Sequence, residues 1–129
     1  DTTIKEAFSR IRPAIINSGY RFPREKVTVN LSPAGKPKEG SHFDLPIALG
    51  ILLLTLGEEA QIEDTAFFGE LSLDGKINPI RGALPLALCA RKAGVHNIVL
   101  PLQNCEEAAV LEDVNIMWKK RIVIWIFQK

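Results

Sequence analysis

The sequence predicts one α/β domain, in which helices and strands are mixed along the chain. Its 129 residues lie within the ~100–200 residues typical of one domain. Stretches with apolar residues at helical spacing alternate with short runs rich in β-branched and aromatic residues. Asp74 and Gly75 form an Asp-Gly pair between two short apolar runs, which is a strong signal for a β-hairpin. We therefore expect a single domain that contains a hairpin.

The first half of the chain is predicted to hold two helices and one strand. Apolar residues at helical spacing predict a first helix that stops near Gly19. We expect a kink or an early end at Pro13, because proline lacks an amide hydrogen and clashes with the preceding turn. Alternation over residues 27–31 predicts a strand, and residues 32–41 predict a loop. Asp44 is expected to cap a second helix that ends near residue 56.

The second half is predicted to alternate strands and helices. Residues 66–71 predict a strand, and the chain would return along residues 77–80 after a turn with positive φ at both central residues. The remaining patterns predict a helix over 82–93, a strand over 97–100, a helix over 104–111 capped by Asn104, and a strand over 114–117. Residues 121–127 form a continuous apolar run that we expect to be buried.

Composition and charge exclude several classes of protein. The hydrophobic share of 47% and the charged share of 24% are ordinary for a globular domain, and a net charge of +1 neither demands nor excludes a polyanionic partner. Cys89 and Cys105 form no CxxC pair, so we expect a reducing, cytoplasmic setting. The sequence lacks an apolar run of about 18 residues, so we expect no membrane partner. It opens without a methionine, and we interpret it as part of a longer protein.

A nucleotide-binding loop is the first chemistry that the sequence suggests. Gly35 and Gly40 have the spacing of the two glycines in a Walker A loop. Ser41 then stands where the phosphate-binding Lys belongs, and His42 stands where a Ser or Thr should hold Mg²⁺. Without that lysine the loop lacks the charge that holds phosphate, so we expect no nucleotide or other cofactor to bind this chain.

A serine nucleophile and a metal centre are the next two possibilities. Ser41 precedes a helix and has Lys38 and His42 as neighbours, but neighbouring side chains on a loop often diverge. We favour the alternative that Ser41 and Asp44 cap the helix. His42 and Asp44 are two residues apart and His96 is remote, which does not supply the four clustered ligands of a structural zinc site. We therefore expect no metal site.

Basic residues interleaved with aromatic residues suggest contact with a nucleic acid. Cationic side chains neutralise phosphates, and aromatic side chains stack on bases. The alternative is a solvated basic edge beside core aromatics. The residues concerned are Arg10, Arg12, Arg21, Arg24 and Lys26 with Tyr20 and Phe22, followed by Lys36 and Lys38 in the loop.

Several motifs together resemble a known family. They are LSPA at 31–34, PKEGSHFDLPIALG at 37–50, FGELSLDG at 68–75 and RGALP at 81–85, after Pro79. In this order and spacing they resemble the N-terminal domain of the magnesium-chelatase-like ATPases of the ComM/YifB type, over residues 1–117. Residues 118–129 would then be a divergent C-terminal tail. The positions that carry the motifs are Gly40, Asp44, Gly69, Glu70, Asp74, Gly75 and Gly82.

The resemblance implies a fold and a setting. The family's domain is similar to the Lon protease domain, which implies an α+β fold (an α/β sandwich) with a mixed sheet, a β-hairpin and packed helices. In full-length members an AAA-type ATPase module follows, and that module would hold ATP and Mg²⁺. The family is linked to hexameric, DNA-dependent motor activity in natural transformation. Its name does not establish chelation.

The comparison with Lon implies that protease chemistry is absent here. Residues 37–40 match the start of Lon's Pro-Lys-Asp-Gly-Pro-Ser pattern, which places His42 at the nucleophile position. Gly82 matches the second glycine before the catalytic lysine, which places Leu86 at the lysine position. A shift of one residue would bring Ser41 to the nucleophile position but would supply no amine, and a hydroxyl without a base is a weak nucleophile. We therefore expect no catalytic residue.

The sequence thus predicts a non-catalytic, Lon-like module of a DNA-processing ATPase. We expect DNA, its own ATPase module and further copies of the chain as partners. The first alternative is a protein-interaction or oligomerisation module without DNA contact. A more distant alternative is a serine protease-like hydrolase that uses Ser41. The nucleic-acid contacts that we predict are Arg10, Arg12, Arg21, Arg24, Lys36 and Lys38.

Overall fold

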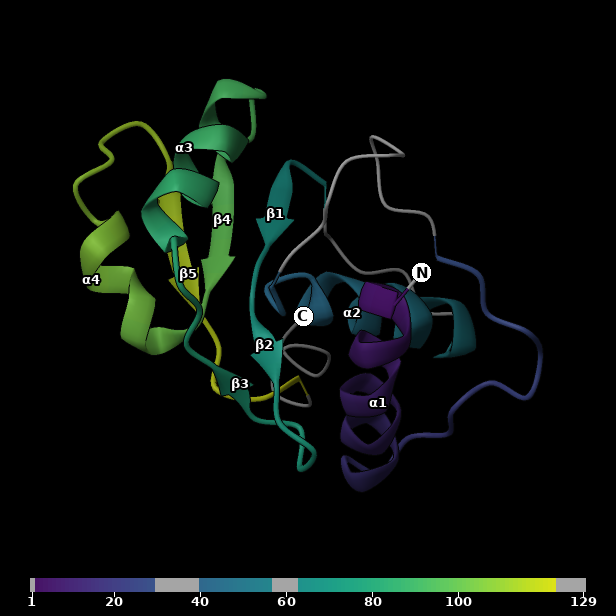
Figure 1. Ribbon diagram of the computed structural model, residues 1–129. Helices are drawn as coiled ribbons and strands as arrows, with labels where there is room; N and C mark the ends of the chain where they lie inside the picture. The colour runs from purple at the N-terminus through teal and green to yellow at the C-terminus, as the bar shows by residue number, and fades with distance from the viewer. Residues whose placement is uncertain (1, 30–39, 57–62, 123–129) are drawn as a thin grey trace.

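The computed structural model describes residues 2–29, 40–56 and 63–122 of the chain. Helices and strands alternate along most of this length (Figure 1). The elements are α1 (Thr2–Asn17), α2 (Asp44–Leu56), β1 (Thr65–Phe67), β2 (Glu70–Leu71), β3 (Ile77–Asn78), α3 (Ala83–Lys92), β4 (Asn97–Leu100), the 3-10 turn η1 (Leu102–Asn104), α4 (Cys105–Ala108) and β5 (Asn115–Trp118).

The described strands form two small sheets with different pairing. Strands β1, β4 and β5 form a parallel sheet in the order β1-β4-β5, in which Ile98 at the centre pairs with Ala66 and Ile116. Strands β2 and β3 form an antiparallel hairpin, in which Leu71 pairs with Ile77. Parallel and antiparallel pairing within one domain confirm the predicted α+β class.

Strand β4 separates two hydrophobic cores. Ile98 and Leu100 are buried against α3 and α4, whereas Val99 is buried against α1 and α2. Successive side chains of a strand point to opposite faces, so this alternation places one core on each side of β4. Helices α3 and α4 lie on one side of the parallel sheet and α1 and α2 on the other (Figure 1), as expected of an α/β sandwich.

Helix α1 continues through Pro13 and ends at Asn17, so of the two alternatives expected at Pro13, a kink or an early end, the early end is excluded. Ala14 and Ile15 follow the proline, and both are completely buried. An interior proline costs a helix about 3 kcal/mol. Burial of this last turn against the core offsets that cost.

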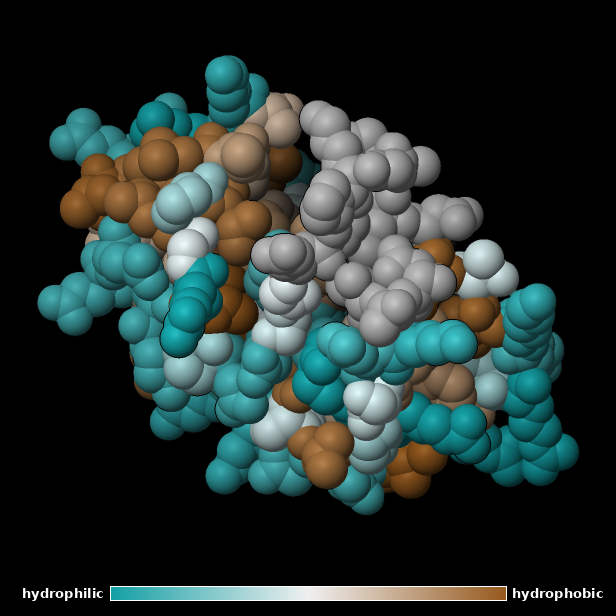
Figure 2. Space-filling model, in the orientation of Figure 1, coloured by the Kyte–Doolittle hydropathy of each residue, from teal (hydrophilic) through white to brown (hydrophobic). Residues whose placement is uncertain are grey.

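Hydrophilic residues cover most of α1 on its outer side, whereas hydrophobic residues gather over α3 (Figure 2).

Two of the predicted strands need correction. Residues 27–29 form no strand in the structure, although Val27 packs against the core; the rest of that prediction, residues 30 and 31, falls outside the described residues. The predicted strand over 66–71 is divided into β1 and β2. The division occurs because the Gly69 amide and carbonyl leave the sheet and bond to His42 O and Leu45 N, both at 3.0 Å. A Cβ at Gly69 would overlap the side chain of Ile77, so this approach depends on glycine.

The predicted hairpin is confirmed, but its turn differs from the prediction. Gly75 has a positive φ of 89°, whereas Asp74 does not have a positive φ. The Gly75 amide bonds to Ser72 O at 2.9 Å and the Ser72 amide bonds to Lys76 O at 3.0 Å, which encloses a three-residue loop. Such loops need one left-handed residue rather than two. The Asp74 carboxylate accepts hydrogen bonds from the Ser72 hydroxyl at 2.8 Å and the Lys76 amide at 3.1 Å.

The last third follows the prediction with two exceptions. Helix α4 ends at Ala108 rather than near residue 111, because the following residues form a turn in which the Leu111 amide bonds to Ala108 O at 3.1 Å. The Asn104 side chain makes no cap and instead binds the Ile80 amide and carbonyl, both at 2.9 Å. Ile122 is completely buried, and residues 123–127 of the predicted apolar run lie outside the described residues.

Helices in the part of the chain that the structure describes are all too short or too polar to cross a bilayer.

Candidate functional site

A buried ion pair lies where α1, α2 and the hairpin meet. Asp44 is the first residue of α2, and its side chain is 1% exposed. Arg10 of α1 donates to both carboxylate oxygens, from Nε at 2.7 Å and from Nη2 at 2.9 Å. The Leu71 amide of β2 donates to the same carboxylate at 3.1 Å. Two forked hydrogen bonds of this kind give a guanidinium–carboxylate pair both strength and direction.

The loop before α2 is tied to the hairpin by a second side-chain contact. The Ser41 hydroxyl donates a hydrogen bond to the Glu70 carboxylate of β2. The Asp44 amide bonds to Ser41 O at 3.0 Å, which closes the loop into α2. The polar partners of the Ser41 and Asp44 side chains are therefore on the hairpin and α1, not on the first turn of α2 as the cap prediction required.

His42 and Leu86 are the two residues that the resemblance to Lon predicts at the positions of its catalytic pair. The His42 ring is half-buried, with its centroid 4.3 Å from that of Phe43. Burial lowers the pKa of His42, and attraction to the Asp44 carboxylate opposes part of that effect. Leu86 is a half-buried residue of α3. Neither side chain supplies the hydroxyl or the amine of a serine–lysine pair.

The residues that were weighed and not favoured as metal ligands, His42, Asp44 and His96, do not form one cluster in the structure. His96 is exposed, and its Nδ1 lies 2.7 Å from the carboxylate of Asp64. His42 and Asp44 lie in the loop and helix described above. Across residues 2–29, 40–56 and 63–122, no three His, Cys, Asp or Glu side chains cluster in a way that could hold a metal ion.

Two of the predicted nucleic-acid contacts already have partners in the fold. The hydrogen bond with Asp44 raises the pKa of Arg10, and burial of the guanidinium lowers it to a smaller extent. Arg10 therefore has a structural partner within the fold, and its contact with phosphate stays a prediction. The Arg12 guanidinium carbon lies 5.3 Å from the centre of the Phe22 ring, a cation–π contact that still leaves the residue exposed.

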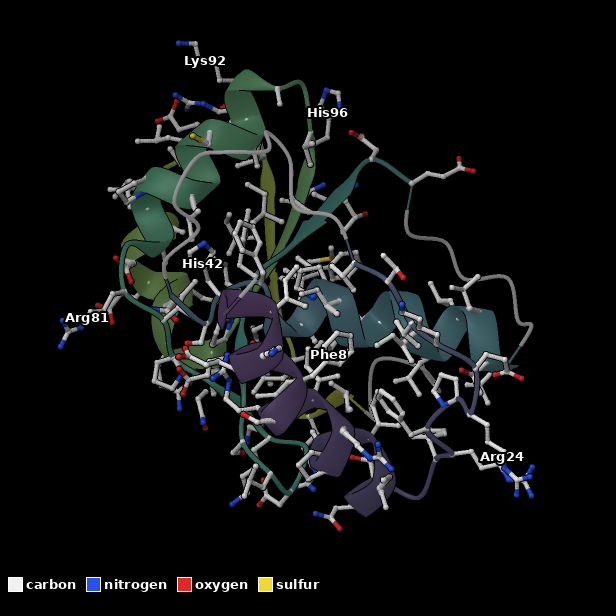
Figure 3. The ribbon with its side chains drawn as sticks, turned by 45° about the vertical axis from the view of Figure 1, so that its right-hand side comes forward. Phe8, Arg24, His42, Arg81, Lys92 and His96 are labelled. Carbon is white, nitrogen blue, oxygen red and sulfur yellow. The ribbon has the colours of Figure 1, made fainter. Side chains whose placement is uncertain are left out.

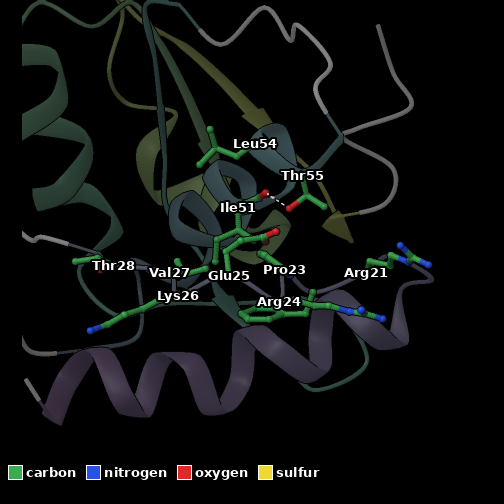
Figure 4. A pocket seen from close by; sticks show the side chains of 11 residues that line it. Arg21, Pro23, Arg24, Glu25, Lys26, Val27, Thr28, Ile51, Leu54 and Thr55 are labelled. Atoms are coloured by element: carbon green, nitrogen blue, oxygen red, sulfur yellow. Dashed lines mark hydrogen bonds between the residues drawn. The ribbon is translucent and has the colours of Figure 1, made fainter.

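A groove brings other basic residues together on the outer side of α2. It has a volume of about 1040 Å³ and lies between residues 21–28 and the second half of α2. Arg21 and Arg24 reach out at one end of the groove and Lys26 at the other (Figure 4). Leu54 lines the groove and is 87% exposed. We call this surface the α2 groove. Lys36 and Lys38, the remaining predicted contacts, lie outside the described residues.

Three of the four glycines that carry the predicted motif adopt backbone conformations that favour glycine. Gly40, Gly75 and Gly82 have φ values of 92°, 89° and 72°. Gly40 lies shortly before α2, Gly75 lies in the turn between β2 and β3, and Gly82 directly precedes α3. The motif therefore specifies local geometry at these points.

Sequence reasoning missed both side-chain pairs of the site. Arg10 and Asp44 are 34 residues apart, and Ser41 and Glu70 are 29 apart. Charge alone assigned Arg10 to a phosphate contact. The usable signal was the helical spacing of Arg10 from Ala7 and Ala14, which are both buried, because an unpaired guanidinium on that face of α1 is costly.

Comparison with known proteins gives the family. Residues 1–104 match the family model described as subunit ChlI of Mg-chelatase. The chain belongs to this family. The match confirms the resemblance to magnesium-chelatase-like proteins that the sequence motifs indicated.

Individual relatives agree with this family assignment. The chain is 36% identical over 124 residues to competence protein ComM of Haemophilus influenzae, and this alignment covers 95% of the chain and 24% of ComM. It is 44% identical over 114 residues to YifB of Salmonella typhimurium, which covers 86% of this chain and 22% of the relative. Lon protease 2 of Syntrophobacter fumaroxidans is 33% identical over 95 residues, or 74% of this chain and 12% of the protease. The chain thus spans about a quarter of the ComM and YifB relatives.

Proposed function

We propose that this domain is a non-catalytic, Lon-like module of a DNA-processing, magnesium-chelatase-like ATPase linked to competence or recombination, and that it contributes to contact with DNA or with other subunits. The non-catalytic role is supported by His42 and Leu86, the residues expected at the nucleophile and lysine positions of Lon, because neither carries a hydroxyl or an amine. The Ser41 hydroxyl donates to Glu70, and a carboxylate is a poor base for a serine hydroxyl. The link to competence rests on the relative named competence protein ComM.

The α2 groove supports the DNA-contact part of the proposal. Arg21, Arg24 and Lys26 carry three positive charges against the single negative charge of Glu25 along the lining. Figure 3 shows Arg24 extending away from the fold, on the side opposite Arg81. Cations that project into solvent exchange bound counterions for phosphates, so binding through them weakens steeply with salt.

The test is a fluorescence-anisotropy titration of the 129-residue chain with labelled single- and double-stranded DNA at low and moderate salt. We expect saturable binding that Arg21→Glu with Arg24→Glu weakens by at least about tenfold, because each substitution replaces a phosphate contact by a repulsion. Arg24→Glu alone is compared with its matched control, Arg81→Glu, which reverses one exposed arginine on the other side of the domain. Absence of binding at low salt, or equal loss with Arg81→Glu, would refute the groove as a DNA contact.

A protein-interaction module is the second candidate, and the exposure of Leu54 favours it. Leu54 is 87% exposed beside the groove and offers an apolar contact that a protein partner would bury, whereas DNA would not. In this case the partner is the parent's own ATPase module or another copy of the chain, up to the hexamer of the family. Salt-insensitive self-association in sedimentation experiments, lost in Leu54→Ser, would favour this function over DNA contact.

We expect no enzymatic activity and no bound cofactor in this domain itself. ATP and Mg²⁺ belong to the ATPase module of the parent protein, and we expect the whole to act in the cytoplasm. A serine-reactive fluorophosphonate probe tests the remaining hydrolase alternative. Labelling that Ser41→Ala removes would overturn the non-catalytic role, whereas we expect no labelling.

A further inference from the structure

The chain after β5 returns along the hairpin and is held there by its backbone. Lys76 and Arg121 form an antiparallel bridge. The Ile77 amide bonds to Lys120 O at 2.8 Å, and the Ile122 amide bonds to Gly75 O at 3.3 Å. These bonds give Lys120 and Arg121 defined positions beside Lys76, although 44 or more residues of sequence separate them from it.

The side chains of this junction are strongly basic. A hollow of about 390 Å³ is lined by three cations, Lys76, Lys120 and Arg121. Asp74 offsets part of this charge, because Arg121 donates to its carbonyl and Lys76 Nζ lies 3.9 Å from its carboxylate. Lys76 nevertheless remains 63% exposed. A concave surface with several cations concentrates anions and attracts polyanions.

An aromatic ring lies next to one of these cations, Lys120. Trp118 is the last residue of β5, and it is 48% exposed. The Lys120 ammonium lies 5.9 Å from the centre of the Trp118 indole, in a cation–π contact. The lysine therefore orients the ring while much of the ring stays accessible to solvent. Cations that follow a phosphate backbone, combined with an aromatic ring on which a base can stack, are the usual components of a site for single-stranded nucleic acid.

We propose that this cationic hairpin surface, formed by Lys76, Trp118, Lys120 and Arg121, binds single-stranded DNA, with phosphates at the three cations and one base against Trp118. Single-stranded DNA fits better than duplex, because the bases of a duplex are stacked on one another and their faces cannot reach an indole. The inference rests on the proposed role in DNA contact but uses residues entirely different from those of the α2 groove.

The fluorescence of Trp118 is a direct test. In a Trp125→Phe background Trp118 is the only tryptophan of the chain. We expect a short oligothymidylate to quench its emission saturably at low salt. Replacing Lys76, Lys120 and Arg121 by serine should lower the slope of log K against log salt by about 2, since each single-strand phosphate contact contributes about 0.7. Trp118→Leu, measured by anisotropy, should weaken binding by at least about fivefold.

Four outcomes separate this surface from its alternatives. Equal quenching by sodium polyacrylate would show a general anion surface and overturn the proposal, as would tighter binding of duplex. Binding that Arg21→Glu with Arg24→Glu removes, while the serine variants bind normally, would overturn the hairpin surface and leave the proposed function intact. Absence of DNA binding by the unsubstituted chain would refute both the hairpin surface and the proposed DNA contact. Lys120→Ser alone keeps the test valid if the triple variant fails to fold, and it should bind at least about threefold more weakly.

Discussion

Removing the Arg10 guanidinium should strongly destabilise this domain, because Arg10 is the counter-ion of the buried Asp44 carboxylate. Arg10→Met keeps the length and the apolar part of the side chain but removes both donors to Asp44. The Asp44 carboxylate, 1% exposed, would then keep the Leu71 amide as its remaining donor among those described above. A buried carboxylate without its counter-ion loses the attraction that compensates its desolvation.

The magnitude follows from the exposure of the pair. Breaking a buried ion pair by removing one partner costs about 3–5 kcal/mol. The Arg10 side chain is 27% exposed, so water reaches part of the site and the lower end, about 3 kcal/mol, applies. With a urea dependence of about 2 kcal/mol per molar for a chain of this size, the midpoint should fall by about 1.5 M.

Urea unfolding followed by far-ultraviolet circular dichroism measures this shift. Arg12→Met is the matched control, because it removes the same group from the same helix but loses a cation–π contact worth about 0.5–1 kcal/mol. Asp44→Asn and the double variant with Arg10→Met complete a thermodynamic cycle. A midpoint shift no larger than that of Arg12→Met, or additive effects of the Arg10 and Asp44 substitutions, would refute the reasoning.

Three further predictions concern the backbone at Gly75, the protonation of His42 and the reactivity of the two cysteine thiols. Gly75→Ala should destabilise the domain by about 1–3 kcal/mol, because φ is 89° and the new Cβ would overlap a serine hydroxyl. Gly50 lies in open space within α2, so Gly50→Ala should instead stabilise the domain by about 0.5–1 kcal/mol in the same urea experiment. Burial lowers the pKa of His42, so protonation favours the unfolded chain and the free energy of unfolding should fall as the pH drops below about 6.5. His42→Gln should flatten that part of a stability–pH curve, and an unchanged curve would contradict the burial of the His42 ring. Burial also raises the pKa of Cys105, so iodoacetamide at neutral pH should modify exposed Cys89 first, as peptide mass spectrometry would reveal; faster reaction at Cys105 would oppose this.

Local patterns predicted most helices and strands of the described chain. Helix α2, strand β4 and the hairpin lie where apolar periodicity and the Asp-Gly pair placed them, because each depends on neighbouring residues. Prediction was wrong where distant residues decide the structure. The burial of Ile15 carries α1 past Pro13, and the bonds of Gly69 to the α2 loop divide one expected strand in two.

The candidate site was less predictable than the fold. Its pairs join residues 29 and 34 positions apart, so no local pattern of charge could match Arg10 with Asp44 or Ser41 with Glu70. The resemblance to Lon directed attention to the loop before α2 and to the hairpin. It did not reveal that the motif's acidic residues bind α1 and that loop. The cationic hairpin surface was also missed, because it forms when the chain after β5 pairs with a hairpin far earlier in the sequence.

The burial of β4 on both faces has a consequence for how the domain can be divided. Val99 closes one core and its neighbours Ile98 and Leu100 close the other, so a fragment without this strand would leave both layers of helices open to water. Neither layer is then an independent folding unit, and local opening at one face weakens the other. Amide hydrogens of β4 should accordingly exchange with solvent at the rate of global unfolding, and proteolytic dissection should yield the intact domain or small peptides rather than a stable half.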